Sequence, residues 1–395
     1  MRNLRYLHFN FRYLITFLFV FHLGCGSSDT SSPPPQEPQK AKNIILLIGD
    51  GMGDEHRKSA SFFAYGSFDK LTMDSLPQKG TVTTHSANNA ITDSAAAATA
   101  MATGVKTSNG VIGMDSDLRP LVTILEEAKM AGKSVGLVTT TQISHATPAA
   151  FASHVSNRDM MTEIASQYLT TEVDLLLGGG EDEFLPSGEI GCYPQVGERQ
   201  DSRNLTQEFI LVGGEYVCDE TSFDQNSTMT TNRLLGLFAD EGMTAPYTPS
   251  LTKMTQKAID LLSRNPNGFF LMIEAGQIDW AGHANNAQKV LDDTLELDEA
   301  VKIVLAFADR DKETLVIVTA DHETGGMEFS TESTGLADED GPFQSNDGQT
   351  FYINWSTTGH TGSRVPINSQ GPGSLALKGR IDNTDIYVAM RDAFF

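Results

Sequence analysis

The sequence predicts an α/β fold whose central, mostly parallel sheet is flanked by helices on both faces. From Lys42 onward, short apolar runs rich in strand-forming residues alternate with segments of helical character. The apolar runs are nearly continuous, which is typical of strands that are buried on both faces of a parallel sheet. Hydrophobic residues make up 39% of the 395 residues, which is enough for a large core. In open sheets of this type, ligands bind beyond the carboxyl ends of the strands.

The alternation predicts five strands and five helices in order along the chain. We expect strands over residues 43–48, 134–139, 173–177, 268–273 and 315–319. We expect helices over residues 94–103, 121–131, 147–155, 251–263 and 287–308. The first helix has the clearest signals, because Asp93 or Thr92 can cap it, a run of alanines extends it, and Gly104 ends it.

Residues 1–24 have the pattern of an export signal. Three arginines and no acid precede an apolar run over residues 14–21, which is too short to remain in a bilayer as a spanning helix. Gly24-Cys25 follows and resembles a bacterial lipoprotein processing site, in which Cys25 would carry the lipid. His22 stands where an aliphatic residue is usual, so ordinary signal cleavage remains an alternative. We therefore expect an exported protein that is periplasmic or at the cell surface, and an outer-membrane lipoprotein if Cys25 is lipidated.

The rest of the chain divides into a spacer and one large domain. Residues 25–41 are rich in Ser and Pro and suit an extended spacer, whereas residues 42–395 carry the α/β pattern. Within that domain, residues 178–250 have Gly clusters and weaker periodicity, which indicates an insertion. Cys192 and Cys218 fall in this insertion, and in an oxidising compartment they are expected to form a disulfide rather than two free thiols.

The acidic balance of the chain limits its partners. It has 51 Asp and Glu against 28 Lys and Arg, a formal charge of −23. A protein that binds nucleic acid through a groove needs a basic face, so this class is excluded. An anionic substrate would require local positive charge, from metal ions or from a few placed arginines.

Polar residues follow the predicted strands and open the first predicted helix. Asp50 lies between glycines directly after the first strand, where it could approach a cation or a phosphate, although such a turn is often only structural. Ser94 lies in the first turn of its helix, where free N–H groups favour an alkoxide or a phosphate. No Gly-x-Ser-x-Gly elbow surrounds Ser94, which argues against an ordinary esterase triad.

Six residues form a candidate set of metal ligands. Asp279 and His283 are four residues apart, so both can face one ion from one side of a helical turn. Asp321 and His322 end the last predicted strand, and His360 lies in a loop of small residues. Together with Asp50 they supply nitrogen and oxygen donors for two tetrahedral zinc sites.

These motifs together resemble alkaline phosphatase, and the resemblance runs in unchanged order over most of residues 42–395. It is carried by these stretches: Ile48-Gly49-Asp50-Gly51-Met52-Gly53, Thr92-Asp93-Ser94-Ala95, His145-Ala146-Thr147-Pro148-Ala149-Ala150, Ile278-Asp279 with Gly282-His283, Thr319-Ala320-Asp321-His322, and Thr357-Thr358-Gly359-His360-Thr361-Gly362. The resemblance implies an α/β sandwich with a metal cluster at the carboxyl ends of its strands.

The resemblance also implies an activity, two kinds of metal ion and a role for each residue. The enzyme would hydrolyse small phosphate monoesters of broad structure through a phosphoserine at Ser94, using two Zn²⁺ and one Mg²⁺. The first zinc would be held by Asp279, His283 and His360, and the second by Asp50, Asp321 and His322. The third site, usually magnesium, would be held by Asp50, Thr147 and Glu274. Arg158 would clamp the phosphate, and Asp93 would orient Arg158.

Two positions vary among members of the family. His145 stands where some members have Asp, and it would tune the third metal ion through coordinated water or let another cation occupy that site. Trp280 stands where members often have His or Lys. Relatives are often dimers, so a homodimer is one candidate assembly.

Two alternative functions remain open. The first is a hydrolase of the same superfamily that acts on phosphodiesters or sulfate esters. Arg158, Thr147 and Glu274 favour monoesters, and the Cys/Ser-x-Pro-x-Arg pattern of sulfatases is absent around Ser94. The second is a non-catalytic surface protein that binds metal or phosphate, which would predict the loss of Ser94 or of several ligands, and none is lost.

Overall fold

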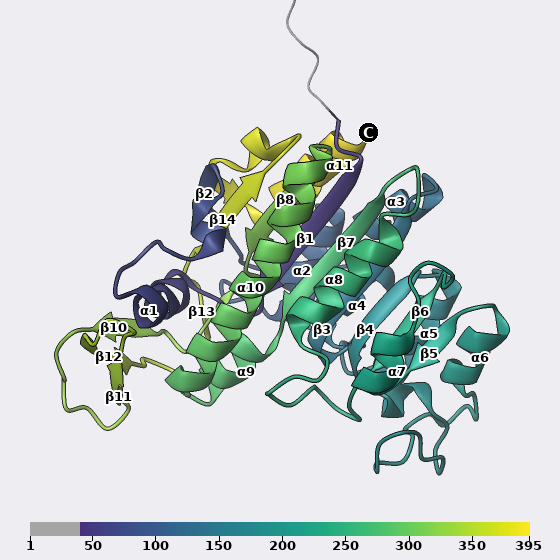
Figure 1. Cartoon of the computed structure of the whole chain (residues 1–395), viewed down its shortest axis with the longest axis horizontal. Coiled ribbons are helices and arrows are strands. Elements are labelled where there is room, and N and C mark those ends of the chain that lie inside the picture. The colour runs from purple at the N-terminus through teal and green to yellow at the C-terminus, as the bar shows by residue number, and fades with distance from the viewer. Residues whose placement is uncertain (1–39) are drawn as a thin grey trace, which may run out of the picture. The chain divides into compact units, whose positions relative to one another are not determined.

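A ten-stranded sheet forms the centre of the protein in a computed structural model, which describes residues 40–395 (Figure 1). In spatial order its strands are β15 (Gly379–Asp382), β2 (Gln78–Thr83), β14 (Val365–Gln370), β8 (Thr314–Thr319), β1 (Asn43–Gly49), β7 (Phe269–Ala275), β3 (Ser134–Gln142), β4 (Leu175–Gly179), β6 (Leu234–Leu237) and β5 (Glu215–Val217). All neighbouring strands are parallel except where β14 pairs with β2 and with β8. The predicted mostly parallel α/β sheet is confirmed.

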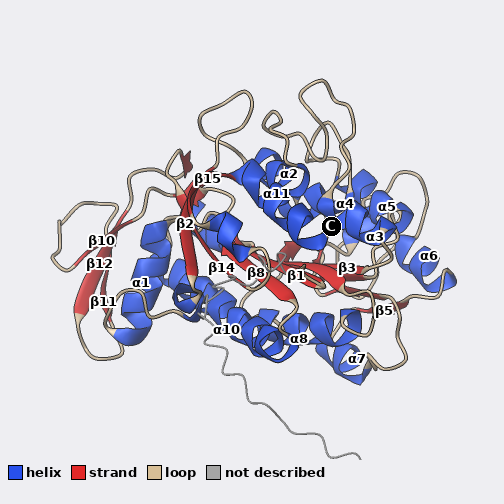
Figure 2. Ribbon diagram, turned by 90° about the horizontal axis from the view of Figure 1, so that it is seen from above, coloured by secondary structure: helices blue, strands red, loops and turns tan. Residues whose placement is uncertain are grey.

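Helices cover both faces of this sheet (Figure 2). One face carries α2 (Ser94–Thr103), α3 (Ile124–Met130), α4 (Ala146–Ala152), α5 (Met161–Thr170), α6 (Leu205–Leu211) and α11 (Asn383–Phe394). The other carries α1 (Asp54–Tyr65), α7 (Glu220–Gln225), α8 (Leu251–Leu262) and α10 (Ala287–Asp311). Helix α9 (Gln277–His283) follows β7 directly. No helix within residues 40–395 combines the length and the apolar character that crossing a membrane requires.

Smaller elements lie outside the central sheet. Strands β10 (Glu328–Ser330), β12 (Thr350–Asn354) and β11 (Asp340–Gln344) form an antiparallel sheet, and β9 (Glu323–Thr324) pairs with β13 (His360–Thr361). Short 3₁₀ turns, η1 (Thr72–Ser75), η2 (Asp182–Phe184) and η3 (Ser374–Leu377), complete the described fold.

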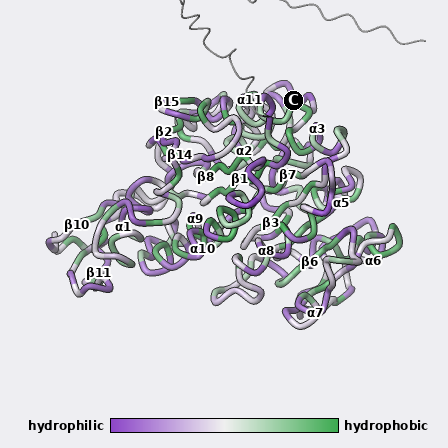
Figure 3. Tube along the Cα trace, turned by 45° about the horizontal axis from the view of Figure 1, so that its top comes forward, coloured by the Kyte–Doolittle hydropathy of each residue, from purple (hydrophilic) through white to green (hydrophobic). Residues whose placement is uncertain are grey.

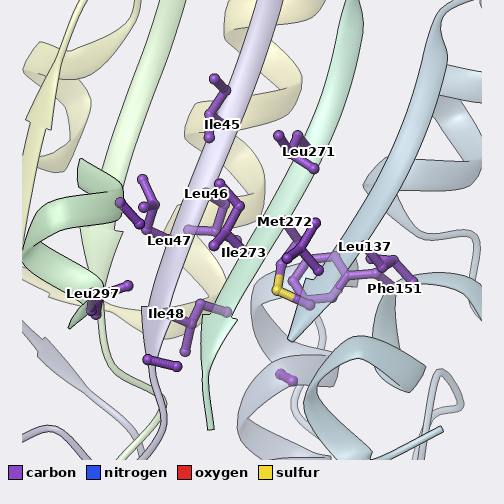
Figure 4. Close-up of a cluster of buried hydrophobic side chains, with 14 of the residues drawn as sticks. Ile45, Leu46, Leu47, Ile48, Leu137, Phe151, Leu271, Met272, Ile273 and Leu297 are labelled. Atoms are coloured by element: carbon purple, nitrogen blue, oxygen red, sulfur yellow. The ribbon is translucent and has the colours of Figure 1, made fainter. Parts of the chain in front are cut away.

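The hydrophobic core surrounds β1, the central strand. Every residue of β1 is buried, and Leu46 packs among Ile273 of β7 and other aliphatic side chains (Figure 4). Phe151 of α4 reaches the same core from the face opposite to α10. Helix α10 alternates between hydrophobic and hydrophilic residues along its length (Figure 3), and Leu297 is among its buried side chains. This sheet is therefore a rigid platform for whatever its edges carry.

The ten predicted elements are all present, but several boundaries differ. Helix 94–103 is confirmed as predicted, whereas α3 begins at Ile124 because Thr123 and Glu126 form a capping box there. Helix α4 ends at Ala152, since Ser153 has an extended backbone, and not at residue 155. Strand β3 continues to Gln142, three residues beyond the predicted end, and β4 begins two residues later than predicted.

The predicted insertion contributes strands to the central sheet. Its strands β6 and β5 extend the sheet beyond β4, in parallel, and a disulfide joins Cys192 to Cys218. These strands were not predicted, because four and three residues are too few to give a periodic pattern. The division into a spacer and one domain stays a prediction, and the predicted export signal lies outside the described residues.

A buried carboxylate in α10 yields a stability prediction. Asp293 is buried, its Oδ1 accepts the Tyr247 hydroxyl at 2.8 Å, and its Oδ2 has no hydrogen-bond partner among residues 40–395. Burial, with help from Asp292 and Glu296, raises the pKa of Asp293 to about 6. The folded state therefore binds this proton more tightly than the unfolded state, and the protein loses stability as pH rises from the ordinary pKa of 3.8 toward 6.

We expect Asp293→Asn to raise the free energy of unfolding above pH 6 by roughly 2–3 kcal/mol. An amide keeps an acceptor for Tyr247 without the buried charge. The gain should vanish below about pH 3, where the carboxyl is protonated in both states. Urea unfolding across this pH range measures the gain, with Asp260→Asn on the exposed face of α8 as control. A gain that is independent of pH would contradict the explanation.

Candidate active site

Three neighbouring strands end at one edge of the sheet and deliver acidic residues there. In the register, Ile48 of β1 pairs with Glu274 of β7 and with Thr319 of β8. Asp50 follows β1, and Asp321 follows β8, so these carboxylates meet at the carboxyl ends of parallel strands. This is the edge at which the sequence analysis placed the site.

The first group of potential metal ligands is Asp279, His283 and His360. His283 Nε2 lies 3.3 Å from Asp279 Oδ2, and His360 Nε2 lies 3.5 Å from Asp279 Oδ1. The Nδ1 atoms face backbone carbonyls instead, at 2.6 Å from Thr358 for His283 and 2.9 Å from Thr92 for His360. These carbonyls hold both rings with Nε2 toward the centre, as is usual for histidines that ligate a metal.

The second group lies around His322. Its Nε2 is 3.4 Å from Asp50 Oδ1 and 3.3 Å from Asp321 Oδ2, and all three side chains are buried. Asp50, Asp279 and His322 also form a compact ligand set, so Asp279 borders both groups. Asp321 Oδ1 accepts the N–H groups of Gly51 and His322, which fixes its orientation.

The third group is Asp50, His145 and Glu274, which are all buried. Thr147, two residues after His145 in α4, is fully buried as well. Trp280 packs edge-on against His145, with 6.0 Å between the ring centroids. The two positions that vary in the family are therefore in contact here, and Asp50 is common to the second and third groups.

The donors of these groups include buried atoms that have no hydrogen-bond partner among residues 40–395. They are both carboxylate oxygens of Asp50, Asp321 Oδ2, Glu274 Oε1, His145 Nδ1 and Thr147 Oγ1. Burying a carboxylate without a partner costs several kcal/mol, because it loses its hydration. Cations would supply the missing interactions, and nitrogen and oxygen donors of this kind suit Zn²⁺ and Mg²⁺. The residues present therefore fit metal ions.

The charges of the cluster show the same need for cations. Burial, together with Asp321, Asp279 and Glu274, raises the pKa of Asp50 well above its usual range. Burial raises the pKa of Glu274 to about 7. Burial and Arg158 lower the pKa of His145 to about 3, so this imidazole is neutral and its nitrogen is free to ligate. A hydrogen bond with Asp279 raises the pKa of His283 to about 9.

Ser94 is the first residue of α2, and its hydroxyl faces the second group. Asp93 caps the helix by accepting the N–H of Ala96 at 3.0 Å, so Ser94 lies in the first turn. Ser94 Oγ is 3.2 Å from His322 Nε2. A helix start with free N–H groups is a favourable place for an oxyanion or a phosphate.

Arg158 contacts Asp93, the residue before Ser94, and also His145 of the third group. Its Nη1 donates to Asp93 Oδ2 at 3.3 Å, and its Nη2 is 3.0 Å from His145 Nε2. Asp93 is itself held by the N–H of Gly110 at 2.9 Å. The guanidinium is half-buried and keeps donors for a phosphoryl group.

No role was predicted for Thr324, which belongs to strand β9. Thr324 is fully buried, its hydroxyl donates to Asp279 Oδ1, and it lies 3.2 Å from His322 Nδ1. It therefore links the first two ligand groups. The only indication in the sequence was that Thr324 lies two residues after His322. In the structure, its strand β9 pairs with the strand of His360.

We expect Thr324→Val to weaken metal binding and to lower activity by roughly 10–100-fold, because outer partners of ligands typically contribute that much. Competition with a chromogenic chelator measures the affinity for the ions. Thr324→Ser restores the hydroxyl and should recover most of it. An unchanged affinity in the Val variant would show that the hydroxyl does not orient the ligands.

Comparison with known proteins assigns the chain to a family. A family model described as alkaline phosphatase matches residues 41–351. The chain belongs to the alkaline phosphatase family. Alkaline phosphatase 4 of Bacillus subtilis (strain 168) is 35% identical, with 91% of this chain and 90% of that protein covered. Alkaline phosphatase of Escherichia coli (strain K12) is 34% identical, with 89% and 86% covered.

A solved structure has the same fold. Alkaline phosphatase from the Antarctic bacterium TAB5 matches with a TM-score of 0.77 and 32% identity, covering 91% of this chain and 99% of that one. Membership of the alkaline phosphatase family makes the chain a phosphoric monoester hydrolase. Members of this family depend on metal ions, and the three ligand groups are the candidate sites for them.

Proposed function

We propose that this enzyme hydrolyses phosphate monoesters to an alcohol and inorganic phosphate through a phosphoserine at Ser94. The observation that carries the proposal is the position of the Ser94 hydroxyl, in the first turn of α2 and 3.2 Å from His322 of the ligand cluster. Arg158 contacts Asp93, the residue before Ser94, and can hold the phosphoryl oxygens. These two residues give a nucleophile and a clamp for one phosphoryl group.

The donor sets support two zinc ions and one magnesium ion. Zinc suits the first group, Asp279, His283 and His360, and the second, Asp50, Asp321 and His322. Magnesium suits the oxygen donors Asp50, Thr147 and Glu274, with His145 beside them. When bound, such ions would neutralise phosphoryl charge and lower the pKa of hydroxyl groups that they contact. A His-to-Asp variant of the TAB5 enzyme has a solved structure described as having Mg bound in the M3 site.

The reaction proceeds in two displacements at phosphorus. Ser94 Oγ forms a bond to phosphorus as the bond to the ester oxygen breaks, and the alcohol leaves with a proton. Water then attacks the phosphoserine, the bond from phosphorus to Oγ breaks, and Ser94 regains its proton as phosphate forms. Throughout, Arg158 holds phosphoryl oxygens, while Asp93 and His145 keep its guanidinium in place.

Arg158 and the third ligand group favour monoesters over diesters and sulfate esters. A monoester has more free phosphoryl charge to neutralise than a diester, and the guanidinium can donate to two oxygens at once. The test is the hydrolysis of a chromogenic phosphomonoester against a phosphodiester and a sulfate ester, with and without chelator. We expect the monoester to be preferred and chelation to abolish turnover until zinc and magnesium are restored. Preference for another ester, or full activity after chelation, would refute the proposal.

The location and assembly follow the sequence predictions and have separate tests. We propose export through residues 1–24 and a lipid on Cys25, for which mass spectrometry of the mature N-terminus is decisive. An unmodified N-terminus at another residue would refute the lipid anchor. A homodimer is testable by light scattering of the purified enzyme.

A further inference from the structure

A cavity of about 590 Å³ lies beyond the carboxyl end of β6, outside the ligand cluster. Four of its lining residues are acidic, and none is Lys, Arg or His. The acidic residues are Asp219, Glu220, Asp240 and Glu241. Two aromatic side chains, Tyr193 and Phe238, also line it. Its size is that of a small-molecule site, and its lining combines negative charge with aromatic surface.

Asp240 is the unusual member of this lining. Asp240 is only 7% exposed, and its Oδ2 accepts the N–H of Gln195 at 3.0 Å. Oδ1 is buried and has no hydrogen-bond partner among residues 40–395. A carboxylate oxygen in this state lacks the donor that would stabilise it. Because Asp240 lines the cavity, a small movement of its side chain would let N–H groups of a ligand there supply one.

The charges around Asp240 are only partly neutralised. Glu220 pairs with Lys253 at 2.6 Å, and Glu241 accepts the amide of Gln142 at 2.6 Å, which brings no positive charge. Asp219 accepts the N–H of Ser222 as the cap of α7. The cavity therefore keeps a net negative charge and attracts cations.

The cavity lies next to the proposed active site. Its lining residue Gly242 packs so closely on Trp280 that a Cβ at this position would lie 2.5 Å from the indole ring. Trp280 also packs against His145, whose Nε2 is 3.0 Å from Arg158 Nη2. One tryptophan side chain thus separates the acidic cavity from the residues around the phosphoryl group.

The cavity suits an organic cation better than a metal ion. Among the described residues, the groups of side chains whose ligand atoms lie close enough to share one metal ion are all in the active site. The carboxylates of this cavity are not among them, so they can contact separate parts of a larger cation. Tyr193 and Phe238 add aromatic surface, to which amines and guanidinium groups bind favourably.

We propose that this cavity binds the cationic portion of the alcohol in a phosphate monoester substrate, such as an amine or guanidinium group that extends past Trp280. The inference rests on the proposed function, because the same substrate must place its phosphoryl group at Ser94. It makes Asp240 a residue that determines substrate preference without touching the reacting atoms.

The test compares pairs of alkyl phosphates that end in an ammonium or in a hydroxyl group, with a short and with a long methylene chain. We expect the long ammonium ester to have a KM about tenfold below that of its hydroxyl partner, and the short pair to differ little. Asp240→Asn should remove the difference while leaving turnover of the hydroxyl esters unchanged. Asp260→Asn removes the same charge from the exposed face of α8 and should keep the difference.

Binding of spermidine to the metal-loaded enzyme gives a readout that is independent of turnover. Calorimetry should detect spermidine with wild type and with Asp260→Asn, but about tenfold weaker binding with Asp240→Asn. Equal KM values for the long pair, or binding of Ca²⁺ at Asp240 in place of spermidine, would overturn the inference while hydrolysis of the hydroxyl esters continued. Failure to hydrolyse any of the esters would instead refute the proposed function.

Discussion

Replacing Ser94 with alanine is expected to lower kcat/KM for a phosphate monoester by roughly 10³-fold or more, because the covalent route is lost. The hydroxyl makes one close contact in the described structure, at 3.2 Å from His322 Nε2, so its removal leaves the ligand cluster in place. Metal content and the free energy of unfolding should therefore stay close to those of wild type. Acid-quenched wild type should contain a phosphorylated Ser94 peptide that the variant lacks.

The matched control for this experiment is Ser59→Ala. Ser59 is also fully buried in a helix, α1, and its hydroxyl has no hydrogen-bond partner among residues 40–395, but it belongs to none of the ligand groups. This variant should keep its activity. More than about a tenth of wild-type activity in Ser94→Ala would rule out the phosphoserine route.

The second large effect is expected for Asp50→Asn, which should lower the stability of the protein when metal ions are bound and raise it when they are removed. With metal ions bound, Asp50→Asn removes a ligand that the second and third groups share, so the variant should be inactive and less stable by about 3 kcal/mol. After chelation the variant should be the more stable protein by a similar amount, because the wild type then buries an unpartnered carboxylate beside three others. Urea unfolding of both proteins, with and without chelator, measures both differences.

The direction in which stability changes with pH follows from the raised pKa of Asp50. Without metal ions the folded state binds this proton more tightly than the unfolded state, so the wild type loses stability as pH rises above 3.8. Asp298→Asn is the control, since Asp298 is a buried carboxylate that accepts the N–H groups of Thr72 and Met73. Its substitution should change the free energy of unfolding by the same amount with and without chelator. The same result for Asp50→Asn would mean that no ion binds there.

How much of this site could be predicted depended on the range of the interactions. Asp50, Asp321 and His322 were predictable because each follows an apolar strand, and parallel strands bring such ends together. Helix α2 was predictable from its local cap and its alanines. The partners of Arg158 and His145 could be named only through the resemblance, since nothing local indicates that these side chains meet.

What escaped prediction depends on contacts between distant segments. Strand β5 has three residues, too few for a periodic pattern, and it exists because it pairs with β6. Thr324 looked like any small residue of a turn, and its importance appears only when Asp279 and His322 lie on either side of it. Asp240 was one acid among 51 until the fold buried it at a cavity.

The reversed direction of β14 explains how the last histidine reaches the active edge. Strands β1, β7 and β8 arrive there with their final residues, and Asp50, Asp279 and Asp321 follow them in the chain. Strand β14 starts at that edge, with Thr319 of β8 donating to the Pro366 carbonyl at 3.0 Å, so residues that precede it in the sequence are delivered. His360 enters by this route, five residues ahead of the strand. Had β14 run parallel to β8, the same histidine would sit at the opposite end of the sheet, roughly 20 Å away. The antiparallel direction of β14 therefore brings His360 to the first ligand group. A rearrangement that reversed β14 would remove this ligand and leave the other strands in place.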